Sequence, residues 1–439
     1  MRQWTVKEWE RLPLGNAPGK IPEPSAAVLT RAAEKSDVIR KRGIAVLDFG
    51  RDSLRARNVV GAISTDSASL EILPKIEVDS NTNDQGENAR SRAQLIRMLA
   101  VAYDIEISAG ELSMLGRQNE TVLEILIRLF CDKLIRLAQR GLPKRYLSRR
   151  DDISALRGRL QIVRQFTVLA ATPQRLACQF DELSEDIALN QIIKAAICAM
   201  RKHAPGIETR RILSELAFFY ADVSEITVAQ LPWEQATIDR TNASWLEVLT
   251  LARLFLQGQY QTTSFGRESG FSLLFDMNTL FESYVAKIAI RAARGTTLRV
   301  HVQGGRKYCL TENGEGERSQ LFQTKPNILI MKAGECRMII DTKWKHLAPL
   351  IEDQKQGVSQ GDVYQMMAYG QLYDCPHCVL LYPHHDALQA HDGIQRSFRV
   401  TDRNETISVA TIDIRNANNV ATVLRALICK ESDNSQSAA

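Results

Sequence analysis

The sequence predicts an α+β protein of several domains: a β-rich N-terminal module, a helical middle domain, and a C-terminal α/β domain with a mixed central sheet. Three observations support this. The chain has 439 residues, more than one ordinary core uses. Its apolar residues recur with period two near the start and with a period of about 3.6 after residue 88. Short apolar runs bounded by turn residues return near the C-terminus. The predicted domains cover residues 1–85, 86–262 and 263–430, followed by a disordered tail, 431–439.

The N-terminal module is predicted from short strand-like segments separated by Gly, Asp and Ser. After an irregular, proline-rich opening and one helical stretch, these segments are GIAVLDFG, ARNVVGAIS and SLEILPKIEV. Pro74 interrupts the apolar/polar alternation of the last segment, which indicates a sheet edge or a bend. Residues 79–88 include no large apolar side chain and are predicted to form a linker.

The middle domain is predicted from helical periodicity. Residues 121–143 form a long helix that Gly141 and Pro143 end, and a later helix is expected to begin with Ser184 as its N-cap. Between these helices lies the most basic segment of the chain. Its candidate nucleic-acid-binding residues are Lys144, Arg145, Arg149, Arg150, Arg157 and Arg159. A phosphate-contacting surface and a solvated helix end explain this segment equally well, because two aspartates neutralise part of its charge.

The C-terminal domain is predicted from two buried strands, 328–331 and 338–340, which a polar turn joins into an antiparallel hairpin. A polar loop is expected over 304–320, and a third core strand over 379–383. His384 and His385 follow that strand and are expected on the surface rather than as metal ligands.

Composition limits the classes of protein that fit. No long uncharged apolar run is present, so no membrane span is predicted, and the polar opening is unlike a secretory signal, so a cytoplasmic location is expected. The net charge of +5 permits a phosphate-rich partner. The eight cysteines mostly lie in apolar segments, as reduced core cysteines do. Cys375 and Cys378 form a single CxxC, which we interpret as a loop because a zinc site needs four ligands.

Two charged side chains end the second strand of the C-terminal hairpin. Asp341 and Lys343 are separated by one residue, so strand alternation places both on the same face of the sheet. A carboxylate and an ammonium are costly to bury at the end of an apolar strand, which favours an active site. A carboxylate binds Mg²⁺ through oxygen, and a lysine can orient or deprotonate water. The pair therefore suits metal-assisted phosphodiester hydrolysis.

Four further residues occur in an order that resembles the PD-(D/E)xK nuclease superfamily. Glu282 interrupts an apolar helical stripe, Asn327 follows Pro326 before the first strand, and Gln365 and Tyr369 share one helical face. The resemblance implies a catalytic set of Asp341, Lys343, Asn327, Glu282, Gln365 and Tyr369, with Mg²⁺ held by Asp341 and Asn327. The family has Asp where this chain has Asn327, so weaker Mg²⁺ binding and partial rescue by Mn²⁺ are expected.

A wider resemblance covers most of the chain. LEILPKI, LRGRL, FDELSEDIALNQIIKAAI and DTKWK with QMMAY occur in the order found in McrC subunits of the McrBC modified-cytosine-dependent restriction systems. It implies an endonuclease subunit that cuts double-stranded DNA and docks through its N-terminal domain into a hexameric AAA+ GTPase of the McrB type. Lys345, two residues after Lys343, is a further candidate nucleic-acid-binding residue. No GxxxxGK[ST] loop is present, so no nucleotide site is expected. The alternative is a non-catalytic subunit that activates the NTPase and binds DNA.

Overall fold

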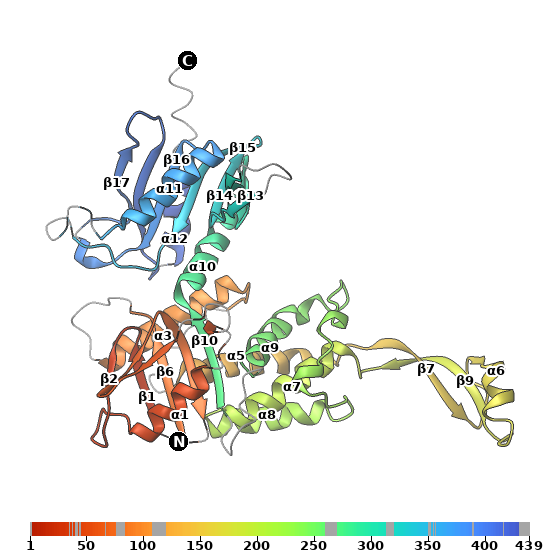
Figure 1. Ribbon diagram of the computed structural model, residues 1–439. Helices are drawn as coiled ribbons and strands as arrows, with labels where there is room; N and C mark the ends of the chain where they lie inside the picture. Colours follow the sequence, from red (N-terminus) through yellow and green to blue (C-terminus); the bar gives the residue numbers. More distant parts are fainter. Residues whose placement is uncertain are drawn as a thin grey trace.

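The computed structural model describes residues 2–429, with gaps. The residues outside the description are 35, 37, 40–42, 44, 66, 76–83, 108–119, 260–269, 313–319, 350–352, 354, 356, 389 and 416. The chain forms two lobes joined by α10 (Met277–Ala292), as Figure 1 shows. Helices and several sheets are mixed in both lobes, which confirms the α+β class.

The first lobe is built on a four-stranded sheet. Its strands in spatial order are β1 (Arg2–Lys7), β6 (Ala68–Leu73), β5 (Val59–Thr65) and β10 (Gly270–Asp276). β1 runs parallel to β6, and the other neighbours are antiparallel. A small sheet packs nearby with α1 (Glu23–Glu34); its strands are β2 (Arg11–Pro13), β4 (Ser53–Ala56) and β3 (Leu47–Phe49). β6 ends at Leu73, immediately before Pro74, and lies inside the sheet rather than at its edge.

Two predicted boundaries differ from the structure. β10 follows the boundary expected at residue 263, yet it pairs along its whole length with β5 of the first lobe. Gly61 allows this pairing: its φ is +128°, and a Cβ there would lie 2.0 Å from the carbonyl oxygen of Leu273. The predicted linker 79–88 overlaps α3 (Asp84–Ala102), because a solvated first helical turn can be as polar as a linker; residues 79–83 lie outside the description.

Helices dominate the middle of the chain, as predicted. They are α3, α5 (Val122–Ala138), α7 (Ala188–His203), α8 (Ile207–Phe219) and α9 (Leu246–Gln259), with the short 3₁₀ turns η1 (Val228–Gln230), η2 (Trp233–Gln235) and η3 (Ala243–Trp245). Thr121 caps α5 by accepting a hydrogen bond from the backbone N–H of Glu124. The apolar faces of these helices share one core with the first sheet.

The basic segment forms a long arm, not a helix end. β7 (Arg145–Ile153) pairs with all of β9 (Leu176–Ser184), and β8 (Arg159–Leu160) and α6 (Ile162–Thr167) lie toward the tip, which projects from the lobe (Figure 1). No residue of β7 is fully buried, so this strand lacks the apolar alternation from which sequence analysis identifies strands. Ser184 therefore ends β9 and is not an N-cap; α7 begins at Ala188 after Ile187.

The second lobe is built on a six-stranded mixed sheet. Its strands in spatial order are β11 (Leu298–Val302), β14 (Ile328–Lys332), β15 (Glu335–Thr342), β16 (His377–Pro383), β18 (Thr406–Ile412) and β17 (Gly393–Arg399). β15, β16 and β18 are parallel, and the remaining pairs are antiparallel. The predicted hairpin and third core strand are confirmed as β14, β15 and β16.

Helices cover both faces of this sheet. α11 (Gln360–Tyr373) lies on one face, where Met366 packs against Ile339 and Leu380. α10 and α12 (Ala417–Cys429) lie on the other, where the core is continuous with that of the first lobe. Alternate strand residues supply the two cores, as period-two geometry requires. No helix among the described residues is long and apolar enough to cross a membrane.

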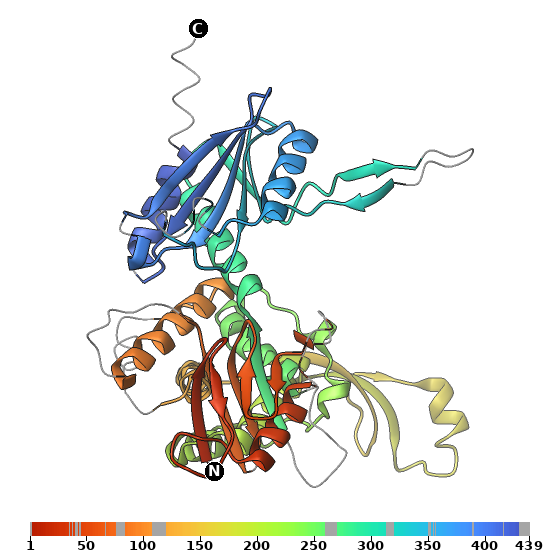
Figure 2. The same ribbon diagram turned by 60° about the vertical axis from the view of Figure 1, so that its left-hand side comes forward.

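Two local predictions for this lobe were wrong. The expected loop 304–320 contains β12 (Tyr308–Thr311), which pairs with β13 (Gln320–Gln323) in a ribbon that projects from the lobe (Figure 2). Every residue of the two strands is exposed, so burial does not impose the apolar/polar alternation from which sequence analysis identifies strands. His385 is buried rather than on the surface, since the segment after β15 covers it and its Nε2 lies 2.8 Å from the Leu347 carbonyl oxygen. That contact lies close to η4 (Asp386–Leu388).

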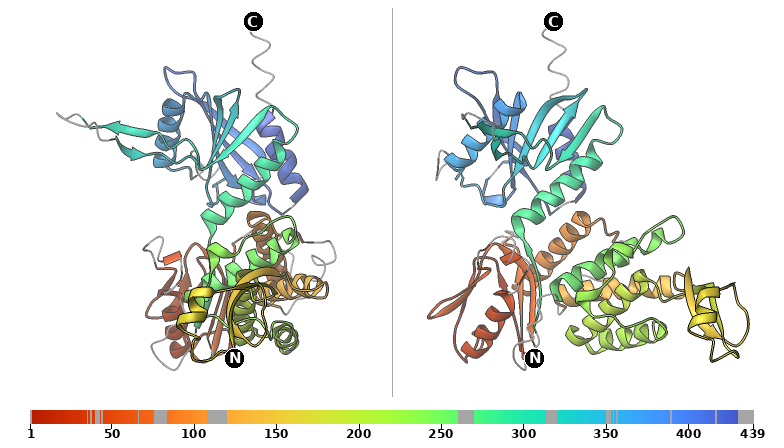
Figure 3. Two further views of the ribbon diagram at one scale, coloured as in Figure 1. Left: turned by 90° about the vertical axis from the view of Figure 1, so that its right-hand side faces the viewer. Right: turned by 45° about the vertical axis from the view of Figure 1, so that its right-hand side comes forward.

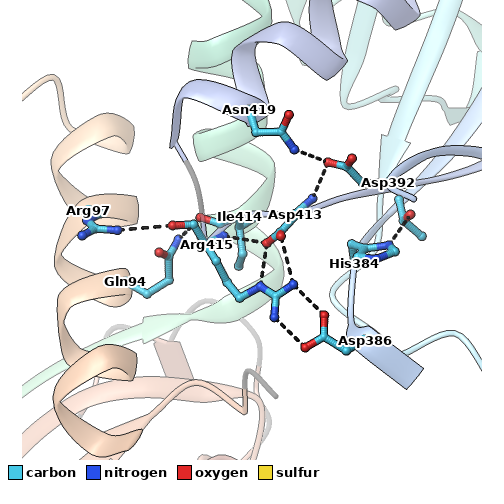
Figure 4. A network of polar contacts seen from close by, with 10 residues as sticks. Gln94, Arg97, His384, Asp386, Asp392, Asp413, Ile414, Arg415 and Asn419 are labelled. Carbon is cyan, nitrogen blue, oxygen red and sulfur yellow. Dashed lines mark hydrogen bonds and ion pairs between the residues drawn. The ribbon is translucent and has the colours of Figure 1, made fainter. Parts of the chain in front are cut away.

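The two lobes also touch outside α10, and Figure 3 shows the lobes with α10 between them from two further sides. Two side chains of α3 donate to backbone carbonyls that follow β18: Gln94 to Ile414 at 2.6 Å and Arg97 to Arg415 at 3.3 Å. The Arg415 guanidinium in turn binds the carboxylates of Asp386 and Asp413 (Figure 4). The loop that accepts the α3 contacts is therefore itself held in place.

Candidate active site

Asp341 and Lys343 lie side by side at the end of β15, as predicted. Asp341 is 3% exposed, and its Oδ2 lies 2.9 Å from the Lys343 ammonium. Burial raises the pKa of Asp341 above its ordinary value, although Lys343 opposes that shift. No other described residue donates a hydrogen bond to this buried Oδ2. A buried carboxylate oxygen with one cationic neighbour is suited to an additional positive ligand.

A second carboxylate, which the sequence analysis missed, completes the surroundings of Lys343. Asp362 in the first turn of α11 lies 3.1 Å from the Lys343 ammonium and 3.3 Å from that of Lys345. Burial alone would raise the pKa of Asp362, but its hydrogen bond with Ser359 and the two lysines lower it. An acidic residue in a first helical turn is readily explained by the helix dipole, so the sequence offered no reason to single it out.

A chain of hydrogen bonds connects Lys343 to the predicted face of α11. The Lys343 ammonium donates to Oε1 of Gln365 at 3.1 Å, and Nε2 of Gln365 donates to the Tyr369 hydroxyl at 2.8 Å. Burial would lower the pKa of Lys343, but the Asp341 and Asp362 carboxylates raise it. Lys343 is thus a firmly held ammonium at neutral pH.

Asn327 lies beside Asp341 on the neighbouring strand. Ile328 pairs with Ile340, so continuing the register by one position places Asn327 opposite Asp341. The Asn327 Oδ1 accepts a hydrogen bond from the backbone N–H of Thr342 at 3.1 Å. The amide therefore has a structural contact to β15 in addition to its place next to the carboxylate.

Glu282 faces the same region from α10 without contacting Asp341 directly. Its charge contributes to the raised pKa of Asp341, and its Oε1 accepts a hydrogen bond from Gln303 at 2.8 Å. Gln303 has a positive φ of 49°, a strained backbone conformation for this residue. Sequence analysis did not identify Gln303, because a lone glutamine after a short strand has no distinctive pattern.

The donor set is compatible with a hard divalent cation but has little negative charge. Asp341 supplies a buried carboxylate oxygen and Asn327 a neighbouring amide oxygen, and oxygen ligands are those that Mg²⁺ prefers. Within the described part of the chain, no three His, Cys, Asp or Glu side chains come together as a metal-binding group. The residues therefore fit a cation that is held by one anion and one neutral donor.

Comparison with known proteins identifies the family. The family described as McrBC 5-methylcytosine restriction system component matches residues 54–383, about three quarters of the chain. The chain belongs to the McrBC family. This confirms the resemblance predicted from the sequence.

Solved structures have the same fold at low sequence identity. A chain of the refined half-complex from the tetradecameric assembly of Thermococcus gammatolerans McrB AAA+ hexamers with bound McrC is 19% identical, with a TM-score of 0.71; the match covers 98% of this chain and 100% of that one. In the cryo-EM structure of the Thermococcus gammatolerans McrBC complex, a chain is 23% identical, with a TM-score of 0.52, and the coverage is 66% and 88%. No curated protein matches.

The predicted basic residues of this McrBC-family chain are not gathered at the active site. Only Lys345 lies there; the others lie on or beside the arm of the first lobe. Most of them are paired with acids on neighbouring segments. The pairs are Lys144 with Glu185, Arg145 with Asp239, and Arg149 and Arg157 with Glu182. The arm therefore has less free positive charge than its sequence indicates.

Proposed function

We propose that this McrBC-family chain is the endonuclease subunit of a restriction system and cuts double-stranded DNA that contains modified cytosines. The observation that carries the proposal is the pair of buried Asp341 and half-buried Lys343. Asp341 lies opposite Asn327, and Lys343 is connected to Gln365 and Tyr369. The mixed sheet with α10 and α11 on opposite faces supports a PD-(D/E)xK arrangement.

Each residue of the site has a distinct proposed role. Asp341 and Asn327 would hold the divalent cation, which supplies a Lewis acid beside the scissile phosphate when bound. Lys343 remains an ammonium because two carboxylates raise its pKa, so it is suited to hold a phosphate oxygen or the attacking water rather than to accept a proton. Gln365, held by Tyr369, keeps the Lys343 ammonium in position.

We propose that a McrB-type AAA+ GTPase ring is the partner, as in the assembly named for the similar structure. The predicted docking element is the N-terminal domain. The arm of the same lobe offers a further surface for binding the partner, because apolar side chains at and near its tip are exposed. They are Leu156, Ile162, Val163, Phe166 and Val168. Charged clusters alone would not explain exposed apolar side chains, which are typical of protein contacts.

A non-catalytic subunit is the second candidate function, and Asn327 is the observation that favours it. The neutral amide leaves Asp341 as the single anion next to the proposed cation, so attraction for Mg²⁺ is weaker than in a site with two carboxylates. Such a chain would stimulate its partner's GTPase and bind DNA without cutting it.

Cleavage of a plasmid with modified cytosines, in the presence of the partner and GTP, tests the proposal. We expect weak cleavage in Mg²⁺, stronger cleavage in Mn²⁺, and a gain of about tenfold in Mg²⁺ from Asn327→Asp, equivalent to ~1.4 kcal/mol of transition-state stabilisation. Lys343→Ala should lower cleavage by about a hundredfold.

Arg337→Ala is the matched control, because Arg337 lies on the same strand but pairs with Glu335 at its far end. It should leave cleavage unchanged. Cleavage that survives Asp341→Ala would place the active site elsewhere. Absence of cutting in both metals, with Asn327→Asp also inactive, would establish the non-catalytic function instead.

A further inference from the structure

A buried acid of the first lobe reaches the active-site strand of the second lobe. Glu8 directly follows β1 and is 2% exposed. Its Oε1 accepts hydrogen bonds from the Trp344 indole N–H at 2.7 Å and from the backbone N–H of Lys75 at 3.0 Å. Trp344 is the residue after Lys343, so the contact is one residue away from the proposed active-site lysine.

Trp344 is held from three directions. Besides Glu8, its backbone N–H donates to Asn278 Oδ1 at 3.2 Å, and its ring packs edge-on against Phe281 at 5.3 Å. Both of these partners lie in α10, and Phe281 directly precedes Glu282. Two residues further on, the His346 ring lies 3.2 Å from the Lys75 carbonyl oxygen. The segment after β15 is therefore attached to the ends of β1 and β6.

We propose that Glu8 is a positioning residue: by binding the Trp344 indole it fixes the backbone at Lys343 and so couples the first lobe to the active-site strand. The cleavage part of this inference rests on the proposed function. If the chain is an endonuclease subunit, a partner bound to the first lobe can influence the active site through Glu8 without touching the active site itself.

An acid at this position makes the coupling sensitive to pH. The second oxygen of Glu8, Oε2, is buried and receives no hydrogen bond from any described residue. Burial raises the pKa of Glu8 to about 7; the charge of Asp276 adds to the shift, and the bonds from Trp344 and Lys75 oppose it. His346 also faces this region through the Lys75 carbonyl. The bond to the indole is therefore charge-assisted above neutrality and weaker below it.

Tryptophan fluorescence of the chain alone tests the contact independently of DNA cleavage. The chain has five tryptophans, so the signal of Trp344 is the difference between the natural chain and Trp344→Phe. We expect this difference to change with a midpoint near pH 7. Glu8→Gln should abolish the transition, whereas Glu10→Gln, at an exposed acid two residues away, should retain it. A transition that persists in Glu8→Gln, or no transition in the natural chain, would overturn the pH-dependent contact.

Cleavage with the partner and GTP tests the coupling. Glu8→Ala and Trp344→Phe should each lower cleavage by about tenfold at pH 7.5 while stimulation of the partner's GTPase stays within about twofold. Glu8→Gln retains an oxygen that can accept the indole N–H, so it should keep most of the activity and lose the pH dependence near neutrality. Trp344→Phe preserves the packing on Phe281, which separates loss of the hydrogen bond from unfolding.

The outcomes separate this inference from the proposed function. Equal loss of cleavage and GTPase stimulation in Trp344→Phe, or full cleavage in both Glu8→Ala and Trp344→Phe, would overturn the coupling. If the natural chain never cuts, the proposed function fails, and the fluorescence transition still decides whether Glu8 holds Trp344.

Discussion

At the scale of single residues, the candidate site combines a neutral amide, Asn327, with a tightly held lysine ammonium, Lys343. Lys343 contacts two carboxylates and a glutamine, so its ammonium has a single well-defined position. Asn327 occupies the place opposite Asp341 and bonds to the strand backbone. A carboxylate at that position would add negative charge next to Asp341, whose pKa is already raised by burial. Without a bound cation, the amide thus avoids repulsion that an acid would introduce.

Glu8 also predicts a pH dependence of stability. Its pKa is raised from 4.5 to about 7, so the folded state binds more protons than the unfolded state between those values. Its contribution to stability is therefore fully present below pH 4.5 and is lost as the pH rises toward 7. Relative to Glu8→Gln, the free energy of unfolding of the natural chain should fall by ~3 kcal/mol between pH 4.5 and about pH 7. Urea unfolding of both proteins at pH 4.5 and pH 8 measures the difference; a constant difference would contradict the prediction.

At the scale of elements, strand pairing between distant segments defines the first lobe. β10 completes a sheet whose other strands all end before residue 74, far earlier in the chain, and Gly61 permits the close approach. The arm and the β12–β13 ribbon show the opposite case, since each pairs locally and projects into solvent. Elements of the first kind belong to the core, and those of the second kind are available for partners.

Gly61→Ala tests the close pairing. The added methyl group would overlap the Leu273 carbonyl, and its φ of +128° is strained for alanine, so we expect a loss of about 3 kcal/mol or more. Gly86→Ala is the control: Gly86 lies in α3, a Cβ there meets nothing within 4 Å, and helix propensity favours alanine by up to ~1 kcal/mol. Thermal unfolding of both variants measures the difference. Similar melting temperatures for Gly61→Ala and Gly86→Ala would contradict the close approach of Gly61 to the Leu273 carbonyl.

The exposed arm tip predicts a defect in partner activation without a loss of stability. Phe166 is 75% exposed, so Phe166→Ser should change the free energy of unfolding by less than about 0.5 kcal/mol. It should nevertheless lower stimulation of the partner's GTPase. Phe218→Ser removes an equally exposed aromatic side chain from α8 and should leave stimulation intact. The same GTPase rate in both variants would exclude the tip from the interface.

At the scale of the whole molecule, one hydrophobic core runs through both lobes. It extends from Val60 in the first sheet through α3 and α10 to Ile340 and Leu424 in the second lobe. The α3 contacts to Ile414 and Arg415 add polar connections at the junction (Figure 4). A movement of the first lobe is therefore transmitted to the second through packed side chains rather than through a loose linker.

This continuous core predicts that the two lobes unfold together. Opening the junction would expose apolar side chains of α3 and α10 on both sides, which is unfavourable by about 25 cal/mol per Å² of apolar surface. We expect a single calorimetric transition for the full chain. Two resolved transitions, with the second lobe melting separately, would show that the junction is weaker than its packing indicates.

The features that depend on residues close together in the chain could be predicted without the structure. The β14–β15 hairpin, the proximity of Asp341 and Lys343, and the shared face of Gln365 and Tyr369 follow from local periodicity, which the backbone geometry imposes wherever those segments fold. A wider set of motifs, from LEILPKI to QMMAY, resembles the McrBC family, and the match to that family confirms the resemblance.

Contacts between distant segments could not be predicted in this way and became visible in the folded chain. Asp362, Gln303 and Glu8 stand out nowhere in the sequence. They join the site or its supports because α11 packs against β15, Gln303 after β11 bonds to Glu282 of α10, and Glu8 after β1 bonds to Trp344. The same holds for β10, whose place in the first sheet depends on an open edge beside β5. Such pairings reflect the complementarity of whole surfaces, whereas periodicity reports only which face of a segment is buried.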